Sequence, residues 1–256
     1  MTRPASRAFH LLLVLALLPL ASCVHRATTP TAAHAWAQSR QLVLVTSASW
    51  EATEGELRRY ERHDGRWRPV SEAVAVSLGR NGTAWGLGLH PTVTGPEKRE
   101  GDGRAPAGVF ALGPAFGYAR SEATRMPYLA MDAEHWCIDV VDSPLYNRIV
   151  DQREVGAAAT AGSTEPMRLD LHANGDPRYR QGIVIAHNPG HVPGAGSCIF
   201  AHLWRRPGEA TAGCTSMDEL AMRALLDWLE PAADPVFVLL PASEYARLRD
   251  AWDLPR

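Results

Sequence analysis

Two residues, Cys214 and His202, have the types and the spacing of a catalytic nucleophile and its base. His202 ends a short apolar run, a loop containing Arg, Pro and Gly follows, and Cys214 comes directly after Gly213. A cysteine attacks a carbonyl carbon as its thiolate, and an imidazole within hydrogen-bond reach removes the thiol proton or pairs with the thiolate. The pattern therefore predicts covalent catalysis through a thioester. The alternative is a core thiol, because free cysteines are often buried packing residues.

The residues beside Cys214 carry two further expectations. Ser216-Met217-Asp218-Glu219 has the form of a capping box, so we expect Ser216 to cap a helix and Cys214 to lie just before its N-terminus. The unpaired N–H groups of a helix N-terminus carry partial positive charge, which stabilises a thiolate. We also expect the Gly213 N–H to donate a hydrogen bond to the oxyanion that forms during the reaction.

Three other cysteines, Cys23, Cys137 and Cys198, bear on the reactivity of Cys214. If Cys23 carries a lipid, an odd number remains, and at least one thiol of an exported protein is then unpaired. Cys198 lies in an apolar run and is expected to be a core residue. A Cys137–Cys198 disulfide would pair two of the three remaining cysteines, although sequence alone cannot establish its geometry.

The elements that must position these residues are short. Apolar runs bounded by Gly, Pro and Asp indicate strands, with a hairpin turn at residues 63–66. We expect a mainly β fold with a few short helices, arranged as an antiparallel barrel or sandwich. One helix follows Ser216 and ends before Pro231, and a second runs from Ser243 to Trp252. The strand candidates are residues 42–45, 74–76, 83–88, 137–141, 183–186, 197–201 and 236–240, and the apolar face expected on the first helix is Leu220, Ala224, Leu225 and Trp228.

The amino-terminal residues indicate export. Arg3 and Arg7 precede an uncharged apolar run at residues 11–20, which is too short to span a bilayer and has the length of a signal-peptide core. The small residues before Cys23 resemble a bacterial lipobox; the alternative is an ordinary signal peptide. We expect residues 1–22 to be a lipoprotein signal peptide, 23–39 a flexible tether and 40–256 a single domain. The protein is then anchored in the periplasm or cell envelope by a lipid on Cys23, at the outer membrane if the host has one.

Composition limits the classes of partner. The formal net charge is −2, so no electrostatic argument favours nucleic acid or an anionic membrane surface. The membrane contact that we expect is the lipid on Cys23, and we expect a monomer. The spacing of His187, His191 and His202 matches no zinc pattern, so we expect no metal site.

The segment around His202 and Cys214 resembles the catalytic domain of L,D-transpeptidases of the YkuD type. His202 matches the first histidine of that family's motif, Thr211 its Ser/Thr, and Gly213-Cys214 its Gly-Cys, while residues 104–110 are similar to its Thr-Pro-x-Gly-x-Phe/Tyr stretch. The resemblance implies the family's β-barrel or sandwich fold and a thioester on Cys214. It also implies peptidoglycan stem peptides as substrates, no cofactor, and Thr211 in the substrate site.

Two departures leave the fate of the acyl group open. Ala212 stands where the family has a second histidine, and Ser216 stands where Arg or Asn is common. We expect Ser216 at the substrate site, and His187, which follows a strand-like run, is a candidate to line the cleft in place of the missing histidine; the alternative for His187 is a loop residue that binds local backbone. Besides transpeptidation, the resemblance leaves open an L,D-carboxypeptidase that uses water and a non-catalytic lipoprotein that binds peptidoglycan.

Overall fold

The computed structural model describes residues 1–2 and 34–256, of which 34–256 form one compact unit. The expected signal peptide beyond its first two residues, the lipidation site at Cys23 and residues 23–33 of the expected tether lie outside the described residues. In the part of the chain that is described, no helix combines the length and the apolar character that a membrane span requires.

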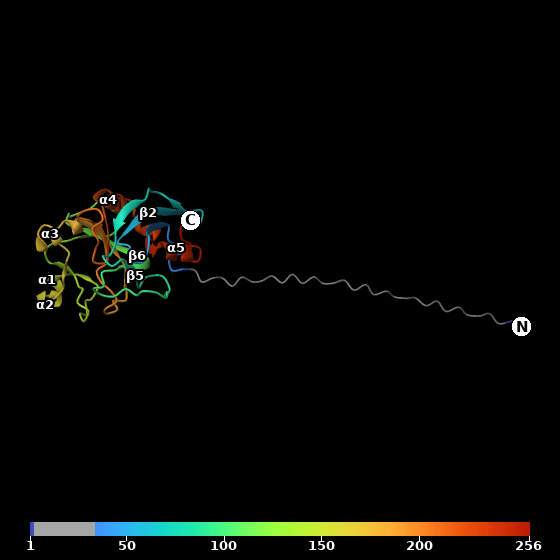
Figure 1. Ribbon diagram of the computed structural model, residues 1–256, viewed down its shortest axis with the longest axis horizontal. Coiled ribbons are helices and arrows are strands. Elements are labelled where there is room, and N and C mark those ends of the chain that lie inside the picture. Colours follow the sequence, from blue (N-terminus) through green and yellow to red (C-terminus); the bar gives the residue numbers. More distant parts are fainter. Residues whose placement is uncertain (3–33) are drawn as a thin grey trace. The chain divides into compact units, whose positions relative to one another are not determined.

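Eight strands form a sheet that closes on itself, because β1 pairs with β14 on one side and with β2 on the other. The fold is therefore mainly β and barrel-like, as the sequence predicts (Figure 1). In order around the ring, the strands are β1 (Gln41–Ser47), β14 (Val236–Pro241), β6 (Ala105–Gly117), β11 (Gln181–Ile185), β12 (Phe200–Leu203), β13 (Thr215–Met217), β4 (Val74–Ser77) and β2 (Glu54–His63).

Three more strands extend this sheet. β3 (Arg66–Pro69) forms the predicted hairpin with β2 through Asp64-Gly65, both of which have positive φ, while β5 (Thr83–Trp85) and β7 (Tyr128–Ala130) pair with β6. The expected antiparallel arrangement is confirmed for six of the eight pairings around the ring and is wrong for two. β1 runs parallel to β14, and β12 runs parallel to β13.

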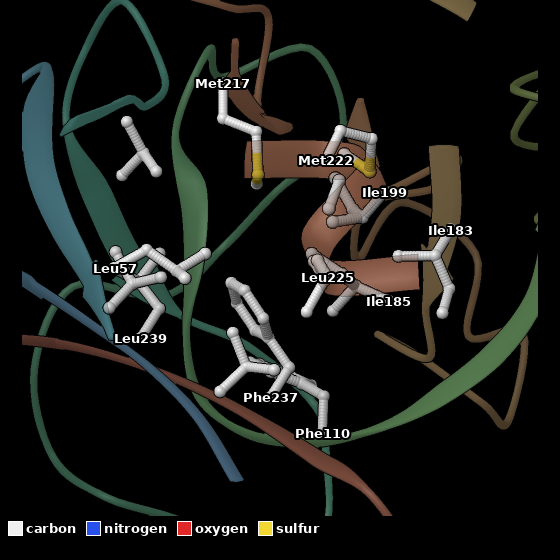
Figure 2. Packing of buried hydrophobic residues seen from close by; sticks show 14 of the residues in the cluster. Leu57, Phe110, Ile183, Ile185, Ile199, Met217, Met222, Leu225, Phe237 and Leu239 are labelled. Atoms are coloured by element: carbon white, nitrogen blue, oxygen red, sulfur yellow. The ribbon is translucent and has the colours of Figure 1, made fainter. Parts of the chain in front are cut away.

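One face of the ring strands packs with helix α4 (Glu219–Trp228) into a single apolar cluster. Figure 2 shows Phe110 and Phe237 next to each other in this cluster, with Leu225 of α4 beside them. The expected apolar face of α4 is wrong in part: Leu220 is 77% exposed, and Met222 and Leu226 are buried with Leu225 instead. The other face of β1 and β14 packs on α5 (Ala242–Leu248), which ends four residues before the predicted Trp252.

Residues 34–39, expected to belong to the tether, pack on the domain. Trp36 is buried, its Nε1 donates to the carbonyl of Trp252 at 3.1 Å, and the two rings meet edge to face. Because a buried indole and its hydrogen bond fix this segment, the domain begins before residue 40 and the predicted boundary at 39 is wrong.

A second, three-stranded sheet lies beside the barrel and is joined to it by a disulfide. Its order is β10 (Glu165–Pro166), β8 (His135–Cys137) and β9 (Ile149–Asp151), and the strand expected at residues 137–141 ends at Cys137. Cys137 forms a disulfide with Cys198, which precedes β12. Three short helices follow the strands of this sheet, and Figure 1 shows them together at one end of the domain: α1 (Gln152–Val155), α2 (Ala157–Thr160) and α3 (Leu169–His172). Two 3₁₀ turns lie elsewhere in the chain, η1 (Arg178–Arg180) and η2 (Pro231–Ala233).

Candidate active site

Cys214 and His202 line one cavity of about 480 Å³, which we call the Cys214 cavity. The barrel contributes His202 of β12 and the segments that precede β12 and β13, and the second sheet contributes β10. Residues far apart in the sequence therefore meet there. Besides Cys214 and His202, the polar and charged lining residues are Arg80, Lys98, Glu100, Asp139, Thr164, Glu165, His172, Arg178, Tyr179, Ser197 and Thr211.

The parallel pairing of β12 and β13 explains why the two predicted catalytic residues share this cavity. His202 is opposite Ser216, and Ala201 is opposite Thr215, so Cys214 stands next to Phe200 in the register. Cys214 lies in the turn that leads into β13, where its Sγ contacts the backbone of Phe200 and Cys198, and His202 lies two residues beyond Phe200 on β12.

His202 is held as a neutral imidazole. It is 2% exposed, and burial lowers its pKa to about 4, although the hydrogen bond to Leu203 opposes this shift. Its Nδ1 lies 2.7 Å from the carbonyl oxygen of Leu203. A carbonyl oxygen only accepts, so Nδ1 carries the proton, and Nε2 is left as an unprotonated acceptor. The ring edge packs on Tyr179, with centroids 5.1 Å apart.

Cys214 has the only free thiol among the cysteines of the described residues. The thiol is buried, and this burial, aided by the charge of Glu165, raises its pKa to about 12. Sγ accepts a hydrogen bond from the Phe200 N–H at 3.4 Å and donates to the Cys198 carbonyl at 3.6 Å. Cys214 therefore rests in the structure as a protonated thiol.

The expectation that Cys214 precedes a helix is wrong. The strand β13 intervenes, and α4 is capped by Asp218, whose side chain accepts from the Ala221 N–H at 2.9 Å. Ser216 is not the cap: it lies within β13, is 1% exposed, and its hydroxyl has no hydrogen-bond partner among the described residues. Ser216 does not line the Cys214 cavity, so its expected place at the substrate site is also wrong.

Thr211 and Gly213 shape the turn that carries the thiol. The Thr211 hydroxyl donates to the Cys214 carbonyl at 2.7 Å and accepts from the Gly213 N–H at 3.1 Å. The Gly213 N–H, expected to face an oxyanion, is thus engaged within the turn. Gly213 has φ +152°, and an added Cβ would lie 3.0 Å from the Arg104 carbonyl oxygen, so this position requires glycine.

His187 lies outside the Cys214 cavity, contrary to its expected role in the cleft. It is 3% exposed; Nδ1 accepts from the Leu87 N–H at 3.2 Å, and Nε2 donates to the Ala195 carbonyl at 2.9 Å. Burial lowers its pKa to about 4. With both ring nitrogens engaged by backbone, His187 joins two loops, which is the alternative that the sequence left open.

The cavity also contains residues that sequence reasoning missed, above all Glu165 and Tyr179. The Tyr179 hydroxyl donates to Glu165 Oε1, and burial raises the pKa of Glu165 to about 7. Neither residue has a spacing that marks it in the sequence. Glu165 comes to the cavity on β10 of the second sheet, and Tyr179 lies in η1, directly before the barrel strand β11. The only available signal was Tyr179 just before the strand-like run at 183–186.

The comparisons with known proteins assign no family. No protein-family model matches the sequence, and no curated protein matches it. A solved structure, that of Bd1075 from Bdellovibrio bacteriovorus, is similar with a TM-score of 0.39 and 12% sequence identity over 84% of this chain and 55% of that chain. The chain thus spans about half the length of Bd1075, and a likeness at this level assigns neither family nor function.

Proposed function

We propose that this protein is a cysteine acyltransferase of the L,D-transpeptidase type, which acts in the cell envelope on peptidoglycan stem peptides through a thioester on Cys214. The observation that carries the proposal is the shared cavity, which is lined by a free thiol and by a neutral imidazole with an available Nε2. The residues that carry the family resemblance, His202, Thr211, Gly213 and Cys214, all lie there or in the turn that shapes it.

The proposed reaction has two steps. Cys214 Sγ attacks the peptide carbonyl of the stem while His202 Nε2 accepts the thiol proton; the C–N bond then breaks, and His202 returns that proton to the departing amine. A second nucleophile, an amine or water, next attacks the thioester and releases the thiol. A neutral His202 is the protonation state that this first step requires, and the low pKa of His202 maintains it at neutral pH.

A second candidate function is a non-catalytic protein that binds peptidoglycan. The state of the thiol favours it: Cys214 is 7% exposed, with a pKa raised by burial to about 12, and the Gly213 N–H is not free for an oxyanion. In this alternative the cavity binds a stem peptide without covalent chemistry.

Intact-mass analysis separates the two candidates. The acyltransferase should gain the mass of one acyl group when it is incubated with a carbapenem or a stem tetrapeptide, and Cys214→Ala should not. Muropeptide analysis then identifies the acceptor, because dimers indicate transfer to an amine and shortened monomers indicate hydrolysis. A protein that binds the tetrapeptide and never forms an adduct would be the non-catalytic alternative.

A further inference from the structure

Glu165 stands out among the acidic residues of the Cys214 cavity because one of its oxygens is free. Oε1 accepts from the Tyr179 hydroxyl, whereas Oε2 makes no hydrogen bond within residues 34–256 and is not sealed from solvent. The other two acids are fully engaged. Glu100 accepts from the Gly101 N–H and from the hydroxyls of Tyr146 and Ser197, and both oxygens of Asp139 accept from Ser163 and Thr164.

No cation of the cavity forms an ion pair with Glu165 within residues 34–256, although the charge of Arg178 lowers the pKa of this carboxyl group. Lys98 Nζ forms an ion pair with Asp102 at 2.7 Å. Arg178 forms one with Asp176: its Nη2 lies 2.7 Å from Oδ2, and its Nε donates to both carboxylate oxygens. Arg80 makes no ion pair in the described part of the chain, and it is exposed at the rim, where its backbone N–H binds Thr211. The free oxygen of Glu165 is therefore available to a cation that enters with a ligand.

The position of Glu165 is unfavourable for the nucleophile and favourable for a cation. After burial, the charge of Glu165 is the largest cause that raises the pKa of Cys214, so this carboxylate opposes thiolate formation. The same charge attracts an ammonium group to the neighbourhood of the sulfur. Tyr179 fixes the carboxylate there, since its hydroxyl binds Oε1 while its ring packs on His202.

We propose that Glu165 binds the amine of the acyl acceptor and removes its proton, so that Cys214 transfers its acyl group to an amine in preference to water. The proposal rests on the proposed function and concerns its second step. The ammonium of the acceptor gives one proton to Glu165 Oε2, and the neutral amine attacks the thioester carbonyl. The C–S bond breaks, His202 relays the second amine proton to Sγ, and Glu165 releases the first to water. An amide, a thiol and one proton result.

The acidity of Glu165 suits this role. Its pKa of about 7 lies where a carboxyl group can both accept and release a proton at neutral pH. Burial is the main cause of this value. The groups that face Glu165 and modify its pKa are Tyr179, Asp139, Arg178 and Glu100.

The first arm of the test measures binding without turnover. Cys214→Ala and the double variant Cys214→Ala/Glu165→Gln are titrated by calorimetry, between pH 6 and 8, with a stem peptide that has a free side-chain amine and with its N-acetylated form. We expect Cys214→Ala to prefer the free amine by at least about tenfold at pH 8 and less at pH 6, and Glu165→Gln to abolish the preference. Equal binding of both peptides, no binding of the free amine, or an unchanged preference in the double variant would overturn the proposal.

The second arm measures the fate of the acyl group. Glu165→Gln, with Cys214 intact, should form the acyl-enzyme at least as fast as the wild type, and its ratio of dimers to shortened monomers should fall at least about tenfold. Glu165→Asp should restore part of the ratio, and Glu219→Gln, an acid outside the cavity, should leave it unchanged. An unchanged ratio in Glu165→Gln would overturn the proton-transfer role. If the first arm succeeds and the wild type forms no acyl-enzyme, the proposed function fails while ammonium recognition stands.

Discussion

The hydroxyl of Thr211 donates a hydrogen bond to the carbonyl oxygen of Cys214 at 2.7 Å and so closes the turn that carries the thiol. The same hydroxyl accepts from the Gly213 N–H, so one side chain forms hydrogen bonds with two backbone groups at or beside the proposed nucleophile. Thr211 is thus best described as a positioning residue, and its role can be tested apart from the chemistry of the thiol.

Replacement of Thr211 by valine should destabilise the protein by about 1–3 kcal/mol, because a buried carbonyl and a buried N–H lose their partner. It should also slow acylation of Cys214, since the turn is no longer fixed. Urea unfolding and the rate of adduct formation are the measurements. Thr211→Ser keeps the hydroxyl and serves as the control; if the serine and valine variants behave alike, the hydrogen bonds do not hold the turn.

Gly213→Ala should be destabilising by about 1–3 kcal/mol, because the residue has φ +152° and its new Cβ would meet the Arg104 carbonyl oxygen at 3.0 Å. Gly175→Ala is a matched control, since Gly175 also has positive φ (+79°) but nothing lies within 4 Å of its added Cβ. Thermal unfolding of both variants compares a crowded position of extreme φ with an open left-handed one, so the loss should be larger for Gly213→Ala. Equal losses would mean that neither the Arg104 contact nor the more extreme φ adds to the cost.

The pKa values of Cys214 and His202 predict different pH profiles for two kinds of reagent. With a thiol pKa of about 12, alkylation by iodoacetamide should rise about tenfold per pH unit from pH 7 to 10, because only the thiolate reacts. Acylation by a bound substrate should instead be nearly flat from about pH 5 to 9, since His202, with a pKa of about 4, is neutral throughout and removes the proton during attack.

The contrast between the two profiles depends on His202. His202→Gln should slow acylation by about 10²–10⁴-fold and make its pH profile rise like that of alkylation. Stopped-flow mass spectrometry of both reactions checks this. Parallel profiles in the wild type would show that His202 does not act as the base.

Loss of the Cys137–Cys198 disulfide should cost about 2–5 kcal/mol of stability, since the bond spans 61 residues and joins the second sheet to the barrel. Cys137→Ser/Cys198→Ser is compared with the wild type by urea unfolding, with and without reductant. Reductant should bring the wild type to the stability of the double variant and leave the double variant unchanged. If the disulfide is reduced and the stability of the wild type does not fall, the bond does not have this role.

Much of the barrel follows from local sequence. The runs at 42–45, 74–76, 183–186 and 236–240 became β1, β4, β11 and β14, because short apolar segments between turn residues have few alternatives to a buried strand. The parallel pairs could not be predicted in this way. Strand direction depends on which neighbours meet around the ring, and no local pattern encodes that.

In the candidate site, too, local sequence identifies some residues, whereas their surroundings depend on non-local pairing. Cys214 and His202 were identified by their residue types, and the structure places both in one cavity. The environment of the thiol was mispredicted because Ser216 and Asp218 are both suitable helix caps, and pairing with β12 keeps Ser216 in a strand. Glu165 was missed because it reaches the thiol only through the second sheet, which depends on non-local pairing and a disulfide.

The central claim is that Cys214 forms a covalent acyl-enzyme, and intact-mass spectrometry tests it most directly. The wild-type protein, incubated at neutral pH with a stem tetrapeptide or a carbapenem, should gain the mass of a single acyl group. Peptide mapping should place that group on Cys214, and Cys214→Ala should gain nothing. An unmodified wild-type mass under conditions in which the tetrapeptide demonstrably binds, or an adduct that persists in Cys214→Ala, would contradict the claim.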